Sequence, residues 1–197
     1  MRKAIAFFDF DGTITTKDTL LEFIRFVKGD LSFYFGFLLH SPILVLYKLQ
    51  IIPNQRAKEM MLHYFFGKMD ADIFEKHCEN FIAERLPALI RPKAVVEIQK
   101  LHDGGADVVV VSASPENWLR AWCEQQGTTC IATKLIVSDN KISGRIEGKN
   151  CHGAEKVTRI KAVYDLTEYT SVYAYGDTSA DRHMLSLADI RFYKPFR

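Results

Sequence analysis

The stretch that most constrains the fold of this 197-residue chain is Phe7-Phe8-Asp9-Phe10-Asp11-Gly12-Thr13. It closes a short apolar run, residues 4–8, and such a run followed by turn residues predicts a strand buried on both faces, as in a parallel sheet. Asp9 and Asp11 are two residues apart, so in extended geometry their side chains point the same way. Carboxylates this close repel each other unless a cation lies between them or a proton is shared. The stretch therefore indicates a bound cation or a shared proton, with a plain Asp-Gly turn as the alternative.

Two later apolar runs have the same form. Residues 107–111 precede Ser112-Ala113-Ser114, and residues 171–175 precede Gly176-Asp177, with Asp181 shortly after. In open α/β sheets, ligands bind outside the carboxyl ends of the strands. Hard oxygen ligands beside phosphate oxygens are what Mg²⁺ prefers. We therefore expect the three strands to bring their acidic and hydroxyl groups to one sheet edge, around a divalent cation and an anion.

Taken together, these motifs resemble those of a known family. Asp9-Phe10-Asp11-Gly12-Thr13, Val111-Ser112-Ala113-Ser114, Lys156 and Gly176-Asp177 with Asp181 are similar to the four-motif signature of the haloacid dehalogenase (HAD) superfamily of phosphohydrolases. The signature spans nearly the whole chain in the right order, which makes it far more specific than any single motif. The chain most resembles the phosphoserine-phosphatase-like branch, subfamily IB, whose members carry a helical cap between the first two motifs.

The resemblance implies an α/β fold. We expect a Rossmann-like core, a parallel sheet with helices on both faces, formed by residues 1–16 and 88–197. Residues 17–87 are predicted to form an inserted, all-helical cap. Alternating strand and helix patterns after residue 88 agree with a parallel sheet, and residues 17–87 hold none of the four motifs.

Residues 31–52 are the most apolar part of the predicted cap. Proline inside a helix costs about 3 kcal/mol, so the sequence predicts two helices with a break near Ser41-Pro42, after an earlier helix that Gly29 stops. Three interpretations stay open for this segment. It is the helical core of the cap, a surface that contacts lipid or a lipid-like substrate, or a membrane span.

The activity that the resemblance implies is Mg²⁺-dependent hydrolysis of a phosphate monoester. Asp9 is expected to act as the nucleophile and form an aspartyl-phosphate, a known use of carboxylates. Asp11 is expected to protonate the leaving oxygen and then to deprotonate the attacking water. The Mg²⁺ ligands would be the Asp9 carboxylate, the Asp11 backbone carbonyl and Asp177.

Further roles also follow from the resemblance alone. The phosphate-binding residues would be Gly12, Ser112, Ala113 and Lys156. Asp181 would support the site by holding Lys156 or a metal-bound water. Taken singly, each of these residues has an ordinary interpretation, as a strand-end hydroxyl, a surface lysine or a first-turn acid. The functional interpretation rests on their occurring together.

The cap is expected to select the substrate, either a small phosphorylated metabolite or a lipid head-group phosphate. In phosphoserine phosphatases an acid after the first motif and a cap arginine hold the amino and carboxylate groups, and Asp18 and Arg56 fall near those places. Alternatively, Asp18 is a helix N-cap and Arg56 a solvated residue. The apolar cap argues against a small zwitterion. It leaves open a lipid head-group phosphatase, acting on a phosphatidylglycerophosphate-like substrate at the membrane surface, and a phosphotransferase with an acceptor other than water.

The composition indicates which partners and which cellular compartment to expect. The net charge is +2 and the basic residues form no run, which gives no reason to expect a nucleic-acid partner. The four cysteines contain no C-x-x-C pair, as in proteins of a reducing compartment. The apolar run after Met1-Arg2-Lys3 is too short for a secretory signal. We expect a cytoplasmic protein, with peripheral membrane contact through the cap as an open alternative.

Overall fold

A parallel sheet forms the centre of the molecule. The computed structural model describes residues 3–197, so the first two residues of the basic start lie outside it. Within the described residues, five parallel strands follow the order β3-β2-β1-β6-β7. Their bounds are β1 (Ile5–Phe8), β2 (Asp107–Pro115), β3 (Thr129–Thr133), β6 (Val172–Gly176) and β7 (Ile190–Tyr193). The predicted Rossmann-like parallel sheet is confirmed.

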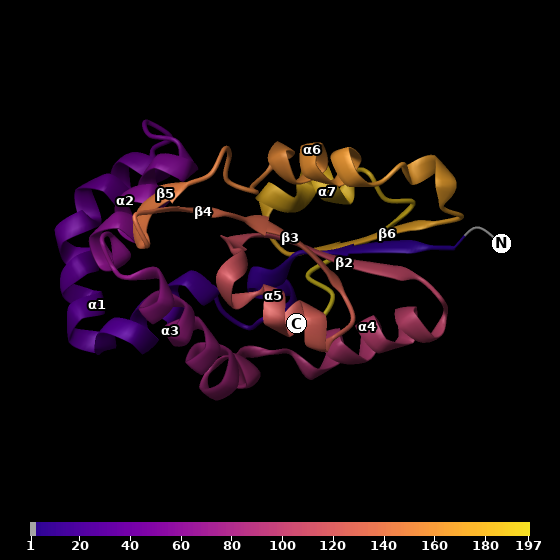
Figure 1. Cartoon of the computed structure of the whole chain (residues 1–197). Helices are drawn as coiled ribbons and strands as arrows, with labels where there is room; N and C mark the ends of the chain where they lie inside the picture. Colours follow the sequence, from indigo (N-terminus) through magenta and orange to yellow (C-terminus); the bar gives the residue numbers. More distant parts are fainter. Residues whose placement is uncertain (1–2) are drawn as a thin grey trace.

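The central strand β1 is buried on both faces, as its apolar sequence predicts. Every residue from Ile5 to Phe8 is 0% exposed. Successive side chains of a strand point to opposite faces, so Ala6 and Phe8 belong to one core cluster and Ile5 and Phe7 to the other. Helices α4 (Pro92–Asp103) and α5 (Arg120–Gln125) cover one face, and α6 (Ala154–Val163) and α7 (Arg182–Leu185) cover the other (Figure 1).

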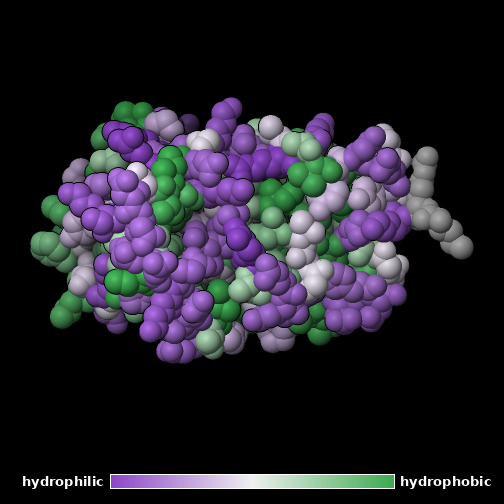
Figure 2. Space-filling model, viewed as in Figure 1, coloured by the Kyte–Doolittle hydropathy of each residue, from purple (hydrophilic) through white to green (hydrophobic). Residues whose placement is uncertain are grey.

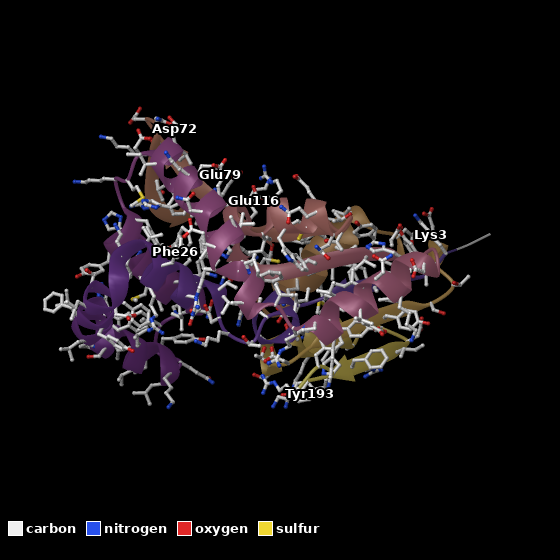
Figure 3. The ribbon with its side chains drawn as sticks, turned by 90° about the horizontal axis from the view of Figure 1, so that it is seen from below. Lys3, Phe26, Asp72, Glu79, Glu116 and Tyr193 are labelled. Carbon is white, nitrogen blue, oxygen red and sulfur yellow. The ribbon has the colours of Figure 1, made fainter. Side chains whose placement is uncertain are left out.

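Three helices lie beyond the carboxyl end of the sheet and form what we call the cap. They are α1 (Thr19–Lys48), α2 (Asn54–Phe66) and α3 (Ala71–Glu84). Phe23 lies at the centre of an aromatic cluster, with ring centroids 4.5 to 5.5 Å from those of Phe66, Phe74, Phe81 and Trp118. Figure 3 labels Phe26 in the cap and Lys3 at the opposite end of the molecule.

The remaining elements are short. Residues 135–146 form an antiparallel hairpin, β4 (Leu135–Ser138) with β5 (Lys141–Ile146). This hairpin packs on the cap, because the amides of Lys68 and Ala71 donate to the carbonyls of Ile142 and Asn140. The short helical turns are η1 (Phe10–Ile14), η2 (Leu86–Leu89), η3 (Glu116–Trp118), η4 (Leu166–Glu168) and η5 (Ser179–Asp181).

The predicted helix break near Ser41-Pro42 is wrong. Helix α1 continues through Pro42, and its irregular residue is Gly29, with φ 76° and ψ 164°. Proline removes the donor that would bond the Leu38 carbonyl four residues earlier. The Ser41 hydroxyl donates to that carbonyl instead, at 2.8 Å. A neighbouring side chain thus replaces the missing hydrogen bond, and the positive φ that bends the chain falls on a glycine, where it causes little strain.

The second half of α1 is largely exposed, which contradicts its interpretation as the core of the cap. Leu31 is 90% exposed and Leu38 71% exposed, whereas Phe33 and Gly36 are buried. Nine exposed apolar residues of α1 and of the turn after it form what we call the α1 face: Leu31, Tyr34, Phe35, Leu38, Leu39, Val45, Leu46, Leu49 and Ile51. Figure 2 shows hydrophobic side chains at the left edge, over α1. Of the helices in residues 3–197, α1 alone has the length and composition of a membrane span, and core helices and signal sequences pass the same test.

Candidate active site

The site begins where β1 ends. Asp9 follows Phe8 directly and is 6% exposed, and η1 then turns the chain away. Gly12 has φ +86°, a conformation that residues with a Cβ rarely adopt. A Cβ at Gly12 would lie 2.5 Å from Oδ2 of Asp177. The Asp-Gly sequence is therefore required both by the backbone turn and by the close approach of a second acid.

A buried lysine joins two of the acids. Lys156 is 2% exposed, and its Nζ lies 2.5 Å from Asp9 Oδ1 and 2.7 Å from Asp181 Oδ1. Burial raises the pKa of Asp9 to about 7, although the charge of Lys156 acts in the opposite direction. Burial also acts to raise the pKa of Asp181, but Lys156 and Thr178 outweigh it and the pKa is lowered. Burial acts to lower the pKa of Lys156, and the two carboxylates more than reverse this, so its pKa is raised and it stays charged.

Three carboxylates converge in a way that fits a hard cation. One oxygen from each of Asp9, Asp177 and Asp181 lies within 4.8 Å of the others. Asp9 Oδ2 also accepts from the Thr13 hydroxyl at 3.2 Å, and Asp177 Oδ2 accepts from Arg197 at 2.5 Å. Oxygen donors of this kind are what Mg²⁺ binds. The structure thus brings together two of the residues predicted as metal ligands, Asp9 and Asp177.

Asp11 is held by hydroxyl groups from two other segments. Its Oδ1 accepts from the amide and hydroxyl of Thr19 at 2.7 and 2.6 Å. Its Oδ2 accepts from the hydroxyls of Ser114 at 2.7 Å and Ser112 at 3.3 Å. Sequence reasoning missed Thr19 and Ser114. The sequence held a signal for Ser114, because it is the second serine of the Ser112-Ala113-Ser114 motif. Nothing in the sequence indicated that Thr19, the first residue of α1, would reach Asp11.

A cavity of about 310 Å³ opens over these groups. Its polar floor includes Asp9, Asp11, Ala113, Lys156 and Asp181. The cap forms a mostly apolar wall opposite, from α1 and α2: Leu20, Leu21, Ile24, Phe37, Leu44, Tyr47, Ala57 and Met61. Three predicted residues lie near the floor residues rather than in the cavity lining. Ser112 donates to Asp11 at 3.3 Å, and an oxygen of Asp177 lies within 4.8 Å of an oxygen of Asp9. Gly12 in turn lies close to Asp177.

The two predicted cap residues are placed differently. Asp18 lines the cavity and also caps α1, because Oδ1 accepts from the Leu21 amide at 3.1 Å. Burial raises the pKa of Asp18 to about 6, and the charge of Asp11 adds to this. Arg56 is not brought to this cavity and lines a separate one with His63 and Arg145. The helix turns 100° per residue, so the side chain two positions later, Lys58, points the opposite way and enters the Asp9 cavity.

The parallel sheet, with acidic residues and a buried lysine at its carboxyl edge, is the arrangement that the sequence motifs predicted for a phosphohydrolase. A family model of haloacid dehalogenase-like hydrolases matches residues 6–186. The chain therefore belongs to the haloacid dehalogenase-like hydrolase family. The predicted family, fold and phosphatase class of enzyme are confirmed.

Relatives with names and structures agree with this assignment. The chain is 34% identical to Protein CicA of Caulobacter vibrioides, over 96% of this chain and 85% of that protein. It is 29% identical to Probable phosphatase Rv3661 of Mycobacterium tuberculosis, over 93% and 66% of the two chains. A Bordetella pertussis protein of unknown function shares the fold with a TM-score of 0.84 at 18% identity, covering 97% and 89% of the chains. A substrate-bound phosphoserine phosphatase shares it with a TM-score of 0.65 at 20% identity, covering 98% and 86%.

Proposed function

We propose that the protein is a Mg²⁺-dependent phosphomonoester hydrolase that works through an aspartyl-phosphate on Asp9. The observation that carries this proposal is the position of Asp9, on the cavity floor and bonded to the buried Lys156. The Asp9 carboxylate, the Asp11 backbone carbonyl and Asp177 would hold the metal. A bound Mg²⁺ supplies positive charge to the phosphoryl oxygens, the main requirement of phosphoryl transfer.

The first step makes and breaks one bond at phosphorus. An Asp9 oxygen forms a bond to phosphorus, the bond from phosphorus to the ester oxygen breaks, and that oxygen takes a proton from Asp11. In the second step Asp11 takes a proton from water as the water oxygen attacks phosphorus, which frees Asp9. The Ser114 hydroxyl holds Asp11 in place, and the Ser112 hydroxyl, which donates to Asp11 in this structure, turns to the phosphoryl group when substrate binds. Because a hydroxyl group can rotate, one of these hydrogen bonds can be replaced by a hydrogen bond between Asp11 and the leaving oxygen.

The phosphoryl group would be bound by groups from three segments. These are the Ser112 hydroxyl, the backbone amides at Gly12 and Ala113, and the ammonium of Lys156. Asp181 keeps that ammonium charged and fixed, because its Oδ1 accepts from Lys156 and its Oδ2 accepts from the Thr178 amide and hydroxyl. Fixed charges that need no rearrangement during reaction are the largest source of catalysis in such sites.

Asp9→Asn tests this proposal. The amide is a poor nucleophile, so release of phosphate from 4-nitrophenyl phosphate should fall to background, and a chelator should abolish wild-type turnover reversibly on return of Mg²⁺. Asp139→Asn makes the same chemical change at an exposed hairpin position with φ 50°, a conformation that asparagine accepts, and should leave turnover unchanged. Wild-type turnover by Asp9→Asn would contradict the mechanism.

The cap is proposed to select the substrate. Residues 17–87 supply the apolar wall of the cavity, which suits a small phosphorylated metabolite with an apolar part better than a compact zwitterion. We infer a second candidate, a lipid head-group phosphatase at a membrane surface, from one observation. The α1 face is exposed, and Phe37, Leu44 and Tyr47 of the same helix line the cavity.

Vesicle binding separates the two candidates. If the protein acts on lipid head groups, it should co-sediment with vesicles of neutral or anionic phospholipid, and the double variant Leu31→Ser/Leu38→Ser should lose that binding. The same variant should keep its turnover of soluble 4-nitrophenyl phosphate. Failure of the wild-type protein to pellet with either kind of vesicle would leave the soluble-metabolite candidate.

A further inference from the structure

Lys58 is a cation in the site that the proposed mechanism does not use. It lies on α2 of the cap and lines the Asp9 cavity. Its Nζ donates to the backbone carbonyl of Ala113 at 2.6 Å. Among residues 3–197, Lys58 forms no ion pair, whereas the two other cations of the site are paired, Lys156 with Asp9 and Asp181 and Arg197 with Asp177.

The surroundings of Lys58 are costly for a charge. Burial lowers its pKa, although the charges of Asp18 and Asp11 act to raise it. A single neutral carbonyl is a weak partner for an ammonium group removed from water. Lys58 therefore lacks a negatively charged partner, and a bound ligand can supply one.

The position of Lys58 identifies the part of the ligand that it meets. The phosphoryl group has its own partner in Lys156, which comes from the core on the floor of the cavity. Lys58 comes from the cap helix α2 and reaches across to the Ala113 carbonyl at the edge of the floor. The charge of Asp11, the residue proposed to face the leaving oxygen, acts on it. Beside it on the same cavity wall are apolar side chains of Leu20, Ile24 and Met61.

We propose that Lys58 determines specificity by binding an anionic group, such as a carboxylate, carried by the leaving group of the substrate. This inference rests on the phosphatase function proposed above. The preferred leaving group then has two parts, an apolar segment against the cap wall and a negative charge at Lys58. Arg56 does not take this role, because the turn of α2 directs it into a different cavity.

Two soluble aryl phosphates of the same shape test the proposal. 4-Carboxyphenyl phosphate carries the second anion and 4-methylphenyl phosphate lacks it, and release of phosphate measures both with Mg²⁺ present. Lys58→Met should raise the KM of the carboxylate substrate by about tenfold, as expected for a lost charge-assisted hydrogen bond. Its KM for the methyl substrate and its kcat for both should stay within about twofold. Lys58→Arg should restore the carboxylate preference.

Arg56→Met is the matched control, with the same loss of charge on the opposite face of the same helix, and should leave both KM values unchanged. Equal changes of KM for the two substrates in Lys58→Met would show a structural role and overturn the inference, as would no change for either. Those outcomes leave the phosphatase function intact. Hydrolysis of neither substrate by the wild-type protein would overturn the proposed function and this inference together.

Discussion

The floor and the cap wall of the candidate active-site cavity differ in how their charged side chains are paired. On the floor, Lys156 and Asp9 are almost fully buried and bonded to each other. On the cap wall, the side chains are mostly apolar, and Lys58 has no carboxylate partner within the part of the chain that the structure describes. Under the proposed function, the core supplies all the groups for chemistry common to phosphate monoesters. Under the same proposal, the cap leaves the charge of Lys58 for the substrate to pair, so we assign the reaction to the core and the selectivity to the cap.

The largest effect that would sharpen this comparison is expected at the buried lysine. Lys156→Met removes the partner of both Asp9 and Asp181, so turnover should fall by about a thousandfold and unfolding should need about 3 kcal/mol less free energy. Lys161→Met, an exposed site on the same helix, should change neither. Phosphate release and urea unfolding measure the two quantities. Retention of activity by Lys156→Met would show that the floor is not the reaction centre.

A second pair of substitutions tests how closely Gly12 and Asp177 pack together beside the floor. Gly12→Ala places a Cβ 2.5 Å from Asp177, and we expect turnover to fall by about a hundredfold because the carboxylate must move. Gly105→Ala has a similar φ of +75° with nothing within 4 Å of the new Cβ. Both variants should lose about 1 kcal/mol of stability to backbone strain, so only the loss of activity distinguishes them. Equal activities would contradict the close packing of Gly12 on Asp177.

Within the cap, stability should separate buried from exposed apolar residues. Phe23→Ala removes the centre of the aromatic cluster and should cost about 3 to 5 kcal/mol in the free energy of unfolding. Leu38→Ser, at a side chain 71% exposed, should change it by less than about 0.5 kcal/mol. Urea unfolding of both variants measures this. A large loss for Leu38→Ser in the isolated protein would show that the α1 face is covered by a second copy of the chain.

The smallest predicted effect is a change in pH dependence within the cap. Burial acts to raise the pKa of Glu22, but the hydrogen bonds from Arg85 and Lys17 outweigh it, so the pKa is lowered. A carboxyl with a lowered folded pKa contributes stability above its unfolded pKa of about 4.3 and loses it as pH falls through the lower folded value. Glu22→Gln should therefore be less stable than wild type at pH 7, and the difference should shrink below pH 4. A constant difference across that range, measured by urea unfolding, would contradict this role.

The sequence predicted the floor better than the wall for a physical reason. Asp9, Ser112 and Asp177 each follow an apolar run, and parallel strands necessarily end at one sheet edge, so their convergence follows from local patterns. The predicted break of α1 at Pro42 was wrong because the Ser41 hydroxyl bonds the carbonyl that Pro42 leaves free. Whether Arg56 or Lys58 enters the Asp9 cavity depends on how α2 is rotated against the core, and tertiary packing decides that rotation. Helical spacing alone says only that the two point apart.

The most direct test of the central claim is to find the phosphoryl group on the enzyme. The protein is mixed with excess 4-nitrophenyl phosphate and Mg²⁺, quenched in acid and digested, and the peptide that contains Asp9 is examined by mass spectrometry. The account predicts one added phosphoryl group on that peptide, its loss on treatment with hydroxylamine, and its absence from Asp9→Asn. Rapid turnover with no phosphorylated peptide at any quench time, or with the group on another residue, would contradict it.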